Sequence, residues 1–302
     1  MTDGRTTLYP MVQFRKDTWE IDEFDCASCF LLIGSERALL IDTGVGLGDL
    51  RGCVEMITDK PVTVVLSHNH GDHIGNAHQW DEVWINPADK EGLIHSQMLD
   101  MMKSYPVQMA NRQKGCFEGV YKMFRLYPYD LNTDLKFTTE ETMPVIHDLT
   151  DGMQFDLGDR IVTAYDCPGH TPGEMVFIDS KERICIAGDA LNYSLGVSSQ
   201  PLEKTLRYLK RLQSMSDQYD AIYNNHHDFR ALGAPLDDDC LPNAIAAMED
   251  AVSGHIVPVT IPNWFGQDLL LSSDDTIESP MGRMYIQWGR NFVGIDPDNI
   301  KE

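Results

Sequence analysis

Apolar residues in the first third of the chain come in short runs that polar turns separate. Residues 28–34 (SCFLLIG) and 36–44 (ERALLIDTG) are two such runs with a brief polar turn between them, as in a β-hairpin. Residues 48–58 (GDLRGCVEMIT) then show helical spacing, and residues 61–67 (PVTVVLS) form a β-branched run. Residues 81–86 (DEVWIN) have the pattern of a further strand. Strand, helix and strand in succession predict an α/β layer structure.

The pattern changes between residues 87 and 145, where strand alternation is lost. Segments 98–113 (MLDMMKSYPVQMANRQ) and 118–128 (EGVYKMFRLYP) are rich in Met and aromatic residues and have a helical pattern. Such helices usually supply core or contact surface, although Met also suits adaptable binding surfaces. We expect a helical insertion here that roofs a pocket.

Strands and helices alternate again in the second half. The elements predicted there are two strands and a turn at 151–167, apolar runs at 168–179 and 182–192, an amphipathic helix at 201–215, a strand within 219–229, a helix at 237–255 and short extended pieces from Ile256 onward. These elements make two β-rich halves, each closed by helices. We expect one domain over 1–302, with a core at about 20–235, the insertion at about 87–145 and a C-terminal extension at about 236–302.

The net charge and the N-terminal residues bear on which partners and which targeting segments are expected. The 302 residues include 24 Lys and Arg against 47 Asp and Glu, a formal net charge of -23. Binding to nucleic acid or to an anionic membrane needs basic patches, so neither partner is expected. The start, MTDGRTTLYPMVQ, lacks a basic segment followed by an apolar run, and no run approaches the roughly 20 apolar residues of a membrane span.

Cysteines indicate a reducing compartment. There are seven, an odd number, and with no export signal we expect reduced thiols in the cytoplasm. Cys26 and Cys29 form a C-x-x-C, which could be redox-active or half of a zinc site. No second pair stands at ligand spacing, so buried strand and turn cysteines are the favoured interpretation.

Polar residues with metal-binding chemistry gather directly after the strand at 61–67. Residues 68–73 (HNHGDH) pack three imidazoles and a carboxylate into six positions. So many polar groups cannot face an apolar core without going unsatisfied. A turn can aim His68 and His70 one way and Asp72 and His73 another, which suits two adjacent cations.

Three further candidates stand at the ends of other apolar runs. His170 follows Pro168-Gly169, Asp189 ends the run ICIAGD, and His226 ends AIYNNH. Taken singly, a histidine after a strand is more often a satisfied surface or core residue than a ligand. Imidazoles with carboxylates form a ligand set for zinc, and also for manganese or iron. Asp189 could bridge two such cations, which would activate a shared water and polarise the bond under attack.

The motif LSHNHGDHIGN resembles the H-x-H-x-D-H signature of the metallo-β-lactamase superfamily of hydrolases. LLIDTG before it, PGHTPGEMVF and AGDAL after it, and NNHHDF near residue 226 extend the resemblance over roughly residues 25–235, in the family's order. The resemblance implies a four-layer αββα sandwich with a dinuclear site on one edge. We expect the helical insertion, the C-terminal helix and the short strands to be added to this sandwich.

The resemblance also implies a division of the ligands. His68, His70 and His170 would hold the first metal, and Asp72, His73 and His226 the second, with Asp189 bridging. The family usually has glycine after the last histidine, whereas His227 stands there in this chain, so His227 is the alternative to His226. Asp42, in LLIDTG, is expected to be a hydrogen-bonding partner of a ligand or a loop brace rather than a ligand itself.

The function implied is hydrolysis of a small-molecule ester, thioester or lactone by a hydroxide that bridges two divalent metals, most readily zinc, with iron or manganese as alternatives. Asp72 could orient this nucleophile or pass its proton on, and Tyr193 is a candidate catalytic residue by its lactonase-like position after Asp189. A small-nucleotide phosphodiesterase and a non-catalytic metal-binding protein are the alternatives. The substrate is the one partner predicted, and homo-oligomer formation is left open.

Overall fold

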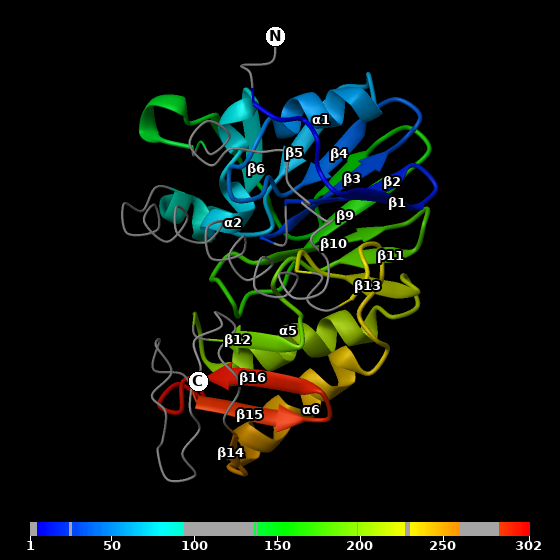
Figure 1. The fold of residues 1–302 in the computed structure, drawn as a ribbon. Coiled ribbons are helices and arrows are strands. Elements are labelled where there is room, and N and C mark those ends of the chain that lie inside the picture. Colours follow the sequence, from blue (N-terminus) through cyan, green and yellow to red (C-terminus); the bar gives the residue numbers. More distant parts are fainter. Residues whose placement is uncertain are drawn as a thin grey trace, which may run out of the picture.

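The computed structural model describes residues 5–23, 26–93, 136, 138–197, 199–226, 230–259 and 284–302. Its first sheet has seven strands in sequence order: β1 (Met11–Arg15), β2 (Thr18–Asp22), β3 (Ser28–Ile33), β4 (Ala38–Ile41), β5 (Val62–Val65), β6 (Glu82–Ile85) and β7 (Val145–Asp148). Strands β1 to β4 pair antiparallel and β4 to β7 pair parallel. Helix α1 (Leu50–Ile57) makes the crossover between the parallel strands β4 and β5 (Figure 1).

The second sheet has five strands in the order β13-β11-β10-β9-β8. These strands are β8 (Gln154–Asp156), β9 (Ile161–Asp166), β10 (Met175–Asp179), β11 (Ile184–Ile186) and β13 (Ala221–Tyr223). A third sheet, in the order β12-β16-β15-β14, contains β12 (Ser194–Val197), β14 (Pro258–Val259), β15 (Met284–Trp288) and β16 (Asn291–Ile295). The remaining short elements are α2 (Gly71–Ile74), η1 (Ala77–Gln79), η2 (Pro87–Leu93) and η3 (Glu140–Thr142).

Side-chain alternation along the strands sets the layers. In β3, Phe30 and Leu32 belong to the core between the first two sheets, whereas Leu31 and Ile33 belong to the core on the α1 side. Because successive side chains of a strand point to opposite faces, an apolar run such as SCFLLI is buried on both. The first sheet is therefore an inner layer, covered by α1 on one face and by the second sheet on the other.

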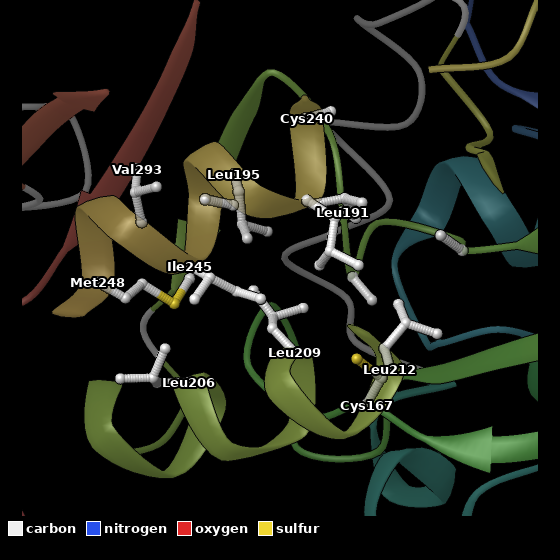
Figure 2. Close-up of a cluster of buried hydrophobic side chains, with 14 of the residues drawn as sticks. Cys167, Leu191, Leu195, Leu206, Leu209, Leu212, Cys240, Ile245, Met248 and Val293 are labelled. Carbon is white, nitrogen blue, oxygen red and sulfur yellow. The ribbon is translucent and has the colours of Figure 1, made fainter. Parts of the chain in front are cut away.

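Two longer helices cover the outer face of the second sheet. They are α5 (Leu202–Ser214) and α6 (Cys240–Ser253), and Gly254 ends α6 in the left-handed conformation with φ 92°. Leu209 and Leu212 of α5 pack with Ile245 and Met248 of α6 in one buried cluster, which Figure 2 shows. With α1, the two sheets and these helices, the predicted four-layer αββα sandwich is confirmed.

The third sheet differs from the expected string of short extended pieces. The pattern of residues 192–197 predicts no strand, yet β12 lies there and pairs parallel with β16, near the end of the chain. Val293 and Ile295 of β16 join the cluster around α5 and α6, so the C-terminal strands pack against the sandwich (Figure 1). This pairing ties the end of the chain to the segment that follows Asp189.

The core of the predicted insertion, with Tyr105, Phe117 and Tyr121, lies outside the described residues, and so does Trp264. Its role as a roof stays a prediction, as does the single-domain assignment. Cys26 and Cys29 are both buried, which agrees with a structural role for the C-x-x-C. None of the helices that the structure describes has the length and apolar character that crossing a membrane would require.

Candidate metal centre

Strand ends place the seven candidate ligands. β5 ends at Val65, and residues 68–73 follow in a turn that enters the short helix α2 at Gly71. His170 lies in the loop between β9 and β10, Asp189 follows β11, and His226 follows β13. Because β11 and β13 are parallel neighbours, Asp189 and His226 emerge at the same edge of the second sheet.

The structure brings all seven residues together in two groups. The first ligand group is His68, His70, His170 and Asp189, and the second ligand group is Asp72, His73 and His226. Within each group the potential ligand atoms lie within 4.8 Å of one another. Residues 100 positions apart meet here, since His70 Nδ1 is 2.9 Å from His170 Nε2. His226 is the histidine of the pair 226–227 that the structure describes, and His227 lies outside the described residues.

Asp189 lies between the two groups. Its Oδ2 is 3.3 Å from His170 Nε2 on one side, and 3.7 Å and 3.4 Å from the Nε2 atoms of His73 and His226 on the other. Burial alone would raise the pKa of the Asp189 carboxyl, but the imidazoles of His226, His73 and His170 outweigh it and hold that pKa well below its usual value. Asp189 is thus an ionised carboxylate in position to contact two cations.

Hydrogen bonds fix which ring nitrogen of three histidines carries a proton. Ser67 Oγ donates its single proton to Asp42 Oδ2 at 2.7 Å. His68 Nδ1 lies 2.9 Å from the same Ser67 Oγ, so His68 Nδ1 must be the donor in that hydrogen bond. His73 Nδ1 donates to Asp42 Oδ2 at 2.9 Å, and His170 Nδ1 donates to the Gly196 carbonyl at 3.1 Å. Because Nδ1 of each ring is committed to a hydrogen bond, Nε2 is the nitrogen through which each ring can bind a metal.

Several of these atoms are buried without a partner. Among the described residues, His68 Nε2, His73 Nε2 and Asp189 Oδ1 are buried side-chain atoms that make no hydrogen bond. An unsatisfied buried polar atom costs about 1–3 kcal/mol, so three at one place indicate a ligand that the chain does not itself supply. Burial also lowers the pKa of His68 and His70, which keeps both imidazoles neutral at neutral pH. Divalent cations fit this donor set of imidazoles and carboxylates.

Exposure of the ligands shows where a substrate can approach. The side chains of His68 and His73 are 0% exposed, whereas those of Asp72 and His226 are 18% and 22% exposed. His68 and His73 therefore lie on the buried side of the centre. Asp72 and His226, the other two members of the second ligand group, lie on its solvent-exposed side. A substrate would meet Asp72 and His226 before it meets His68.

Asp42 has the supporting role that the sequence predicts. It is fully buried with φ 65°, and its carboxylate accepts hydrogen bonds from His73 Nδ1, from the backbone N–H and hydroxyl of Ser67, and from Asn225 Nδ2. One carboxylate therefore holds His73 directly, His68 through Ser67, and the residue before His226.

Ser67, Asn225, Glu174 and Gly196 are site residues that sequence reasoning missed. Glu174 is fully buried, and its Oε1 accepts from the backbone N–H of Asp189 at 2.9 Å. A Cβ on Gly188 would lie 2.5 Å from this oxygen, so glycine permits the close approach. Only the position of Ser67 and Asn225, each one residue before a candidate histidine, could have marked them in advance.

Tyr193, the other candidate catalytic residue, has a partner outside the two ligand groups. Its hydroxyl donates to the Asp237 carboxylate and accepts from the Asp237 backbone N–H at 2.9 Å. Partial burial and the bond to Asp237 raise the pKa of Tyr193 to about 12, so the phenol stays protonated at neutral pH. Arg290 Cζ lies 5.6 Å from the centre of its ring. A catalytic role for Tyr193 stays a prediction.

Two proteins of known sequence resemble this chain over more than half of its length. Human acyl-coenzyme A thioesterase MBLAC2 is 27% identical over 177 residues, which are 55% of this chain and 58% of the relative. The match thus spans less than two thirds of that protein. The uncharacterized protein YobT of Bacillus subtilis is 24% identical over 186 residues, which are 60% of this chain and 70% of YobT.

Solved structures show the same fold at lower identity. The sec-alkylsulfatase Pisa1 from Pseudomonas sp. has a TM-score of 0.55 at 15% identity, over 82% of this chain and 43% of that enzyme. A metallo-β-lactamase from Cronobacter sakazakii has a TM-score of 0.51 at 20% identity, over 81% of this chain and 95% of that protein. At such identities the likeness concerns the fold alone.

A family model settles the relationship that the motifs predicted. The model described as metallo-β-lactamase superfamily matches residues 25–201, more than half of the 302 residues. The matched range contains six of the seven candidate ligands, all except His226. The chain belongs to the metallo-β-lactamase superfamily.

Proposed function

We propose that this protein is a metal-dependent hydrolase of small-molecule thioesters, with acyl-coenzyme A as the first substrate class to test. The observation that carries the proposal is the convergence of seven imidazole and carboxylate side chains, among which His68 Nε2, His73 Nε2 and Asp189 Oδ1 are buried and make no hydrogen bond. The thioesterase named among the relatives favours a thioester over the ester and lactone. We further propose zinc as the native metal, because imidazole nitrogens predominate among the ligands.

Bound divalent metals would supply Lewis acidity toward the substrate carbonyl and lower the pKa of a water molecule at the site. The residues of the chain do the positioning. Asp42 holds the ring of His73 directly and that of His68 through Ser67, and Asp189 lies within reach of both groups. Asp72, with its carboxylate 18% exposed and 3.5 Å from His226 Nε2, is the group placed to orient water or accept its proton.

Release of coenzyme A from acyl-coenzyme A of several chain lengths tests the substrate class directly. We expect zinc-loaded protein to hydrolyse at least one of them, and His255→Ala, which changes an exposed histidine outside the site, to retain full activity. Chromatographic detection of coenzyme A avoids a signal from the protein's own thiols. Cleavage of a phosphodiester panel together with no thioester cleavage would contradict the proposal and favour the alternative substrate class.

Replacing Ser67 with Ala should weaken metal binding without removing a ligand. The change deletes the hydroxyl that accepts from His68 Nδ1 and donates to Asp42, so His68 loses the partner that fixes its protonation. Loss of such a supporting hydrogen bond typically lowers metal affinity about 10–100-fold. Competition of the protein against a zinc chelator measures the change. Wild-type affinity in Ser67→Ala would contradict the assigned role of the hydroxyl.

A further inference from the structure

Two buried carboxylates lie just outside the ligand set. Asp89, in η2, is 0% exposed, and Glu23, after β2, is 1% exposed. Neither belongs to the two ligand groups; Asp89 accepts hydrogen bonds from the loop that carries His170, and Glu23 accepts them mainly from residues 45–47, which pack beside α2. A buried carboxylate persists only where donors satisfy its oxygens, so the donors show what each one holds in place.

Asp89 joins the two loops that supply imidazoles to the first ligand group. Its Oδ2 accepts from Thr171 Oγ1 at 2.6 Å and its Oδ1 from the Gly173 backbone N–H at 2.8 Å, directly after His170. Its backbone carbonyl accepts from Asn69 Nδ2 at 3.1 Å, between His68 and His70. A Cβ on Gly173 would lie 2.8 Å from Asp89 Cγ, so the loop is pressed against this carboxylate.

Glu23 holds a different loop. Its carboxylate accepts from the backbone N–H groups of Val45, Gly46 and Leu47, the last at 2.7 Å, and from Asn76 Nδ2 at 3.1 Å. All four partners are donors, and each carboxylate oxygen accepts at least one N–H group; these bonds offset in part the burial that raises the pKa of Glu23. Gly44, with φ 69°, passes so close that a Cβ would lie 2.5 Å from the Glu23 carboxylate.

The segment that Glu23 holds is hydrogen-bonded to the backbone around His73 and Gly75. Thr43 donates to the His73 carbonyl from its backbone N–H at 2.7 Å and from its hydroxyl at 3.0 Å. The Gly75 backbone N–H donates to the Gly44 carbonyl at 2.7 Å. Helix α2, with Asp72 and His73, therefore rests on the segment that Glu23 fixes.

We propose that the two metal positions are supported separately, the first by Asp89 and the second by Glu23, as positioning residues. The inference rests on the proposed dinuclear centre. A substitution can therefore reduce metal affinity at one position and leave the metal affinity at the other position unchanged. Neither carboxylate touches a ligand side chain in the hydrogen bonds described above, so each acts through the backbone of a ligand loop.

The hydrogen-bond donors around Asp89 and Glu23 determine which substitutions each of these two residues should tolerate. At residue 89 an Asn can accept from Gly173 N–H with its oxygen and donate to Thr171 Oγ1 with its amide, because a hydroxyl can accept as well as donate. Asp89→Asn should therefore resemble the wild type, whereas Asp89→Ala should not. Glu23→Gln would turn an NH2 group toward a backbone N–H, so this conservative change should be disruptive.

Zinc titration, combined with anomalous diffraction from crystals grown at limiting zinc, tests the proposal. We expect two peaks in the wild type and an about tenfold loss of affinity in each disruptive variant. In Asp89→Ala the peak at His68, His70 and His170 should fade, and in Glu23→Gln the peak at Asp72, His73 and His226 should fade. If Glu23→Gln does not fold, Thr43→Val removes only the hydroxyl bond to His73 and should weaken the same second peak.

These experiments distinguish a failure of separate support from a failure of the proposed metal centre. Two wild-type peaks that fade equally in both folded variants, or in neither, would overturn separate support and leave the proposed centre intact. Wild-type affinity at both positions in Asp89→Ala would also overturn it. Failure of the wild type to bind zinc at these residues would remove the proposed function and this inference together.

Discussion

Replacing Asp189 with Ala is expected to lower hydrolytic turnover about a thousandfold. Its Oδ2 lies within 3.7 Å of imidazoles from both ligand groups, so the variant loses the carboxylate shared by the two metal positions. Metal stabilisation of transition-state charge is worth several kcal/mol, and each 1.36 kcal/mol is a factor of about ten in rate. Steady-state thioester hydrolysis and zinc content of the same samples measure the effect.

Two further variants make this result specific. Asp189→Asn keeps the volume of the side chain but removes the charge held against His170, His73 and His226, so it should be nearly as inactive as the alanine variant. His255→Ala removes an exposed histidine that lies outside both ligand groups and should be fully active. Turnover in Asp189→Ala within about tenfold of wild type would show that no shared carboxylate is needed.

Replacing Arg160 with Met should destabilise the fold by about 3–5 kcal/mol. The guanidinium is fully buried and donates to Asp179 at 2.6 Å, to Thr18 Oγ1 at 2.7 Å and to the Asp17 carbonyl at 3.0 Å. These bonds connect β9 and β10 of the second sheet to the β1–β2 turn of the first. Removing one partner leaves the Asp179 carboxylate buried and without its cation, which is why the cost is large. Urea unfolding at a fixed zinc concentration measures it.

An exposed ion pair supplies the matched control. Arg183 contacts Asp220 at 2.8 Å, but the two side chains are 43% and 69% exposed. Arg183→Ala should therefore destabilise the fold far less than Arg160→Met does, because solvent screens an exposed ion pair. Replacing both members of the buried pair, Arg160→Met with Asp179→Leu, should be less damaging than Arg160→Met alone because no unpaired charge remains. Equal costs for Arg160→Met and Arg183→Ala would contradict the role given to the buried pair.

Local patterns predicted the elements whose residues interact along the chain. The amphipathic pattern of residues 201–215 indicated α5, the run PVTVVLS indicated β5, and the pattern of residues 237–255 indicated α6. The six-residue motif at 68–73 pointed to the site because its polar density could not be buried without a ligand. Asp42 was also recognisable, since a carboxylate directly after an apolar strand lies near the strand-end histidines.

The remaining features depend on contacts between distant segments. Nothing in the pattern of Ser194–Val197 indicates that this strand pairs with β16, 98 residues later, or that Gly196 accepts a bond from His170. Glu23 and Asp89 resemble ordinary polar residues until folding brings the loops 45–47 and 171–173 onto their oxygens. Burial of a charged side chain is a property of the tertiary structure, so residue type alone could not reveal these two supports.

We expect the seven side chains to form one dinuclear metal centre. Anomalous diffraction at the zinc edge, from crystals of zinc-loaded wild-type protein, tests it most directly. The account predicts one peak among His68, His70, His170 and Asp189 and a second among Asp72, His73 and His226. A single peak, or peaks away from these residues, would contradict it.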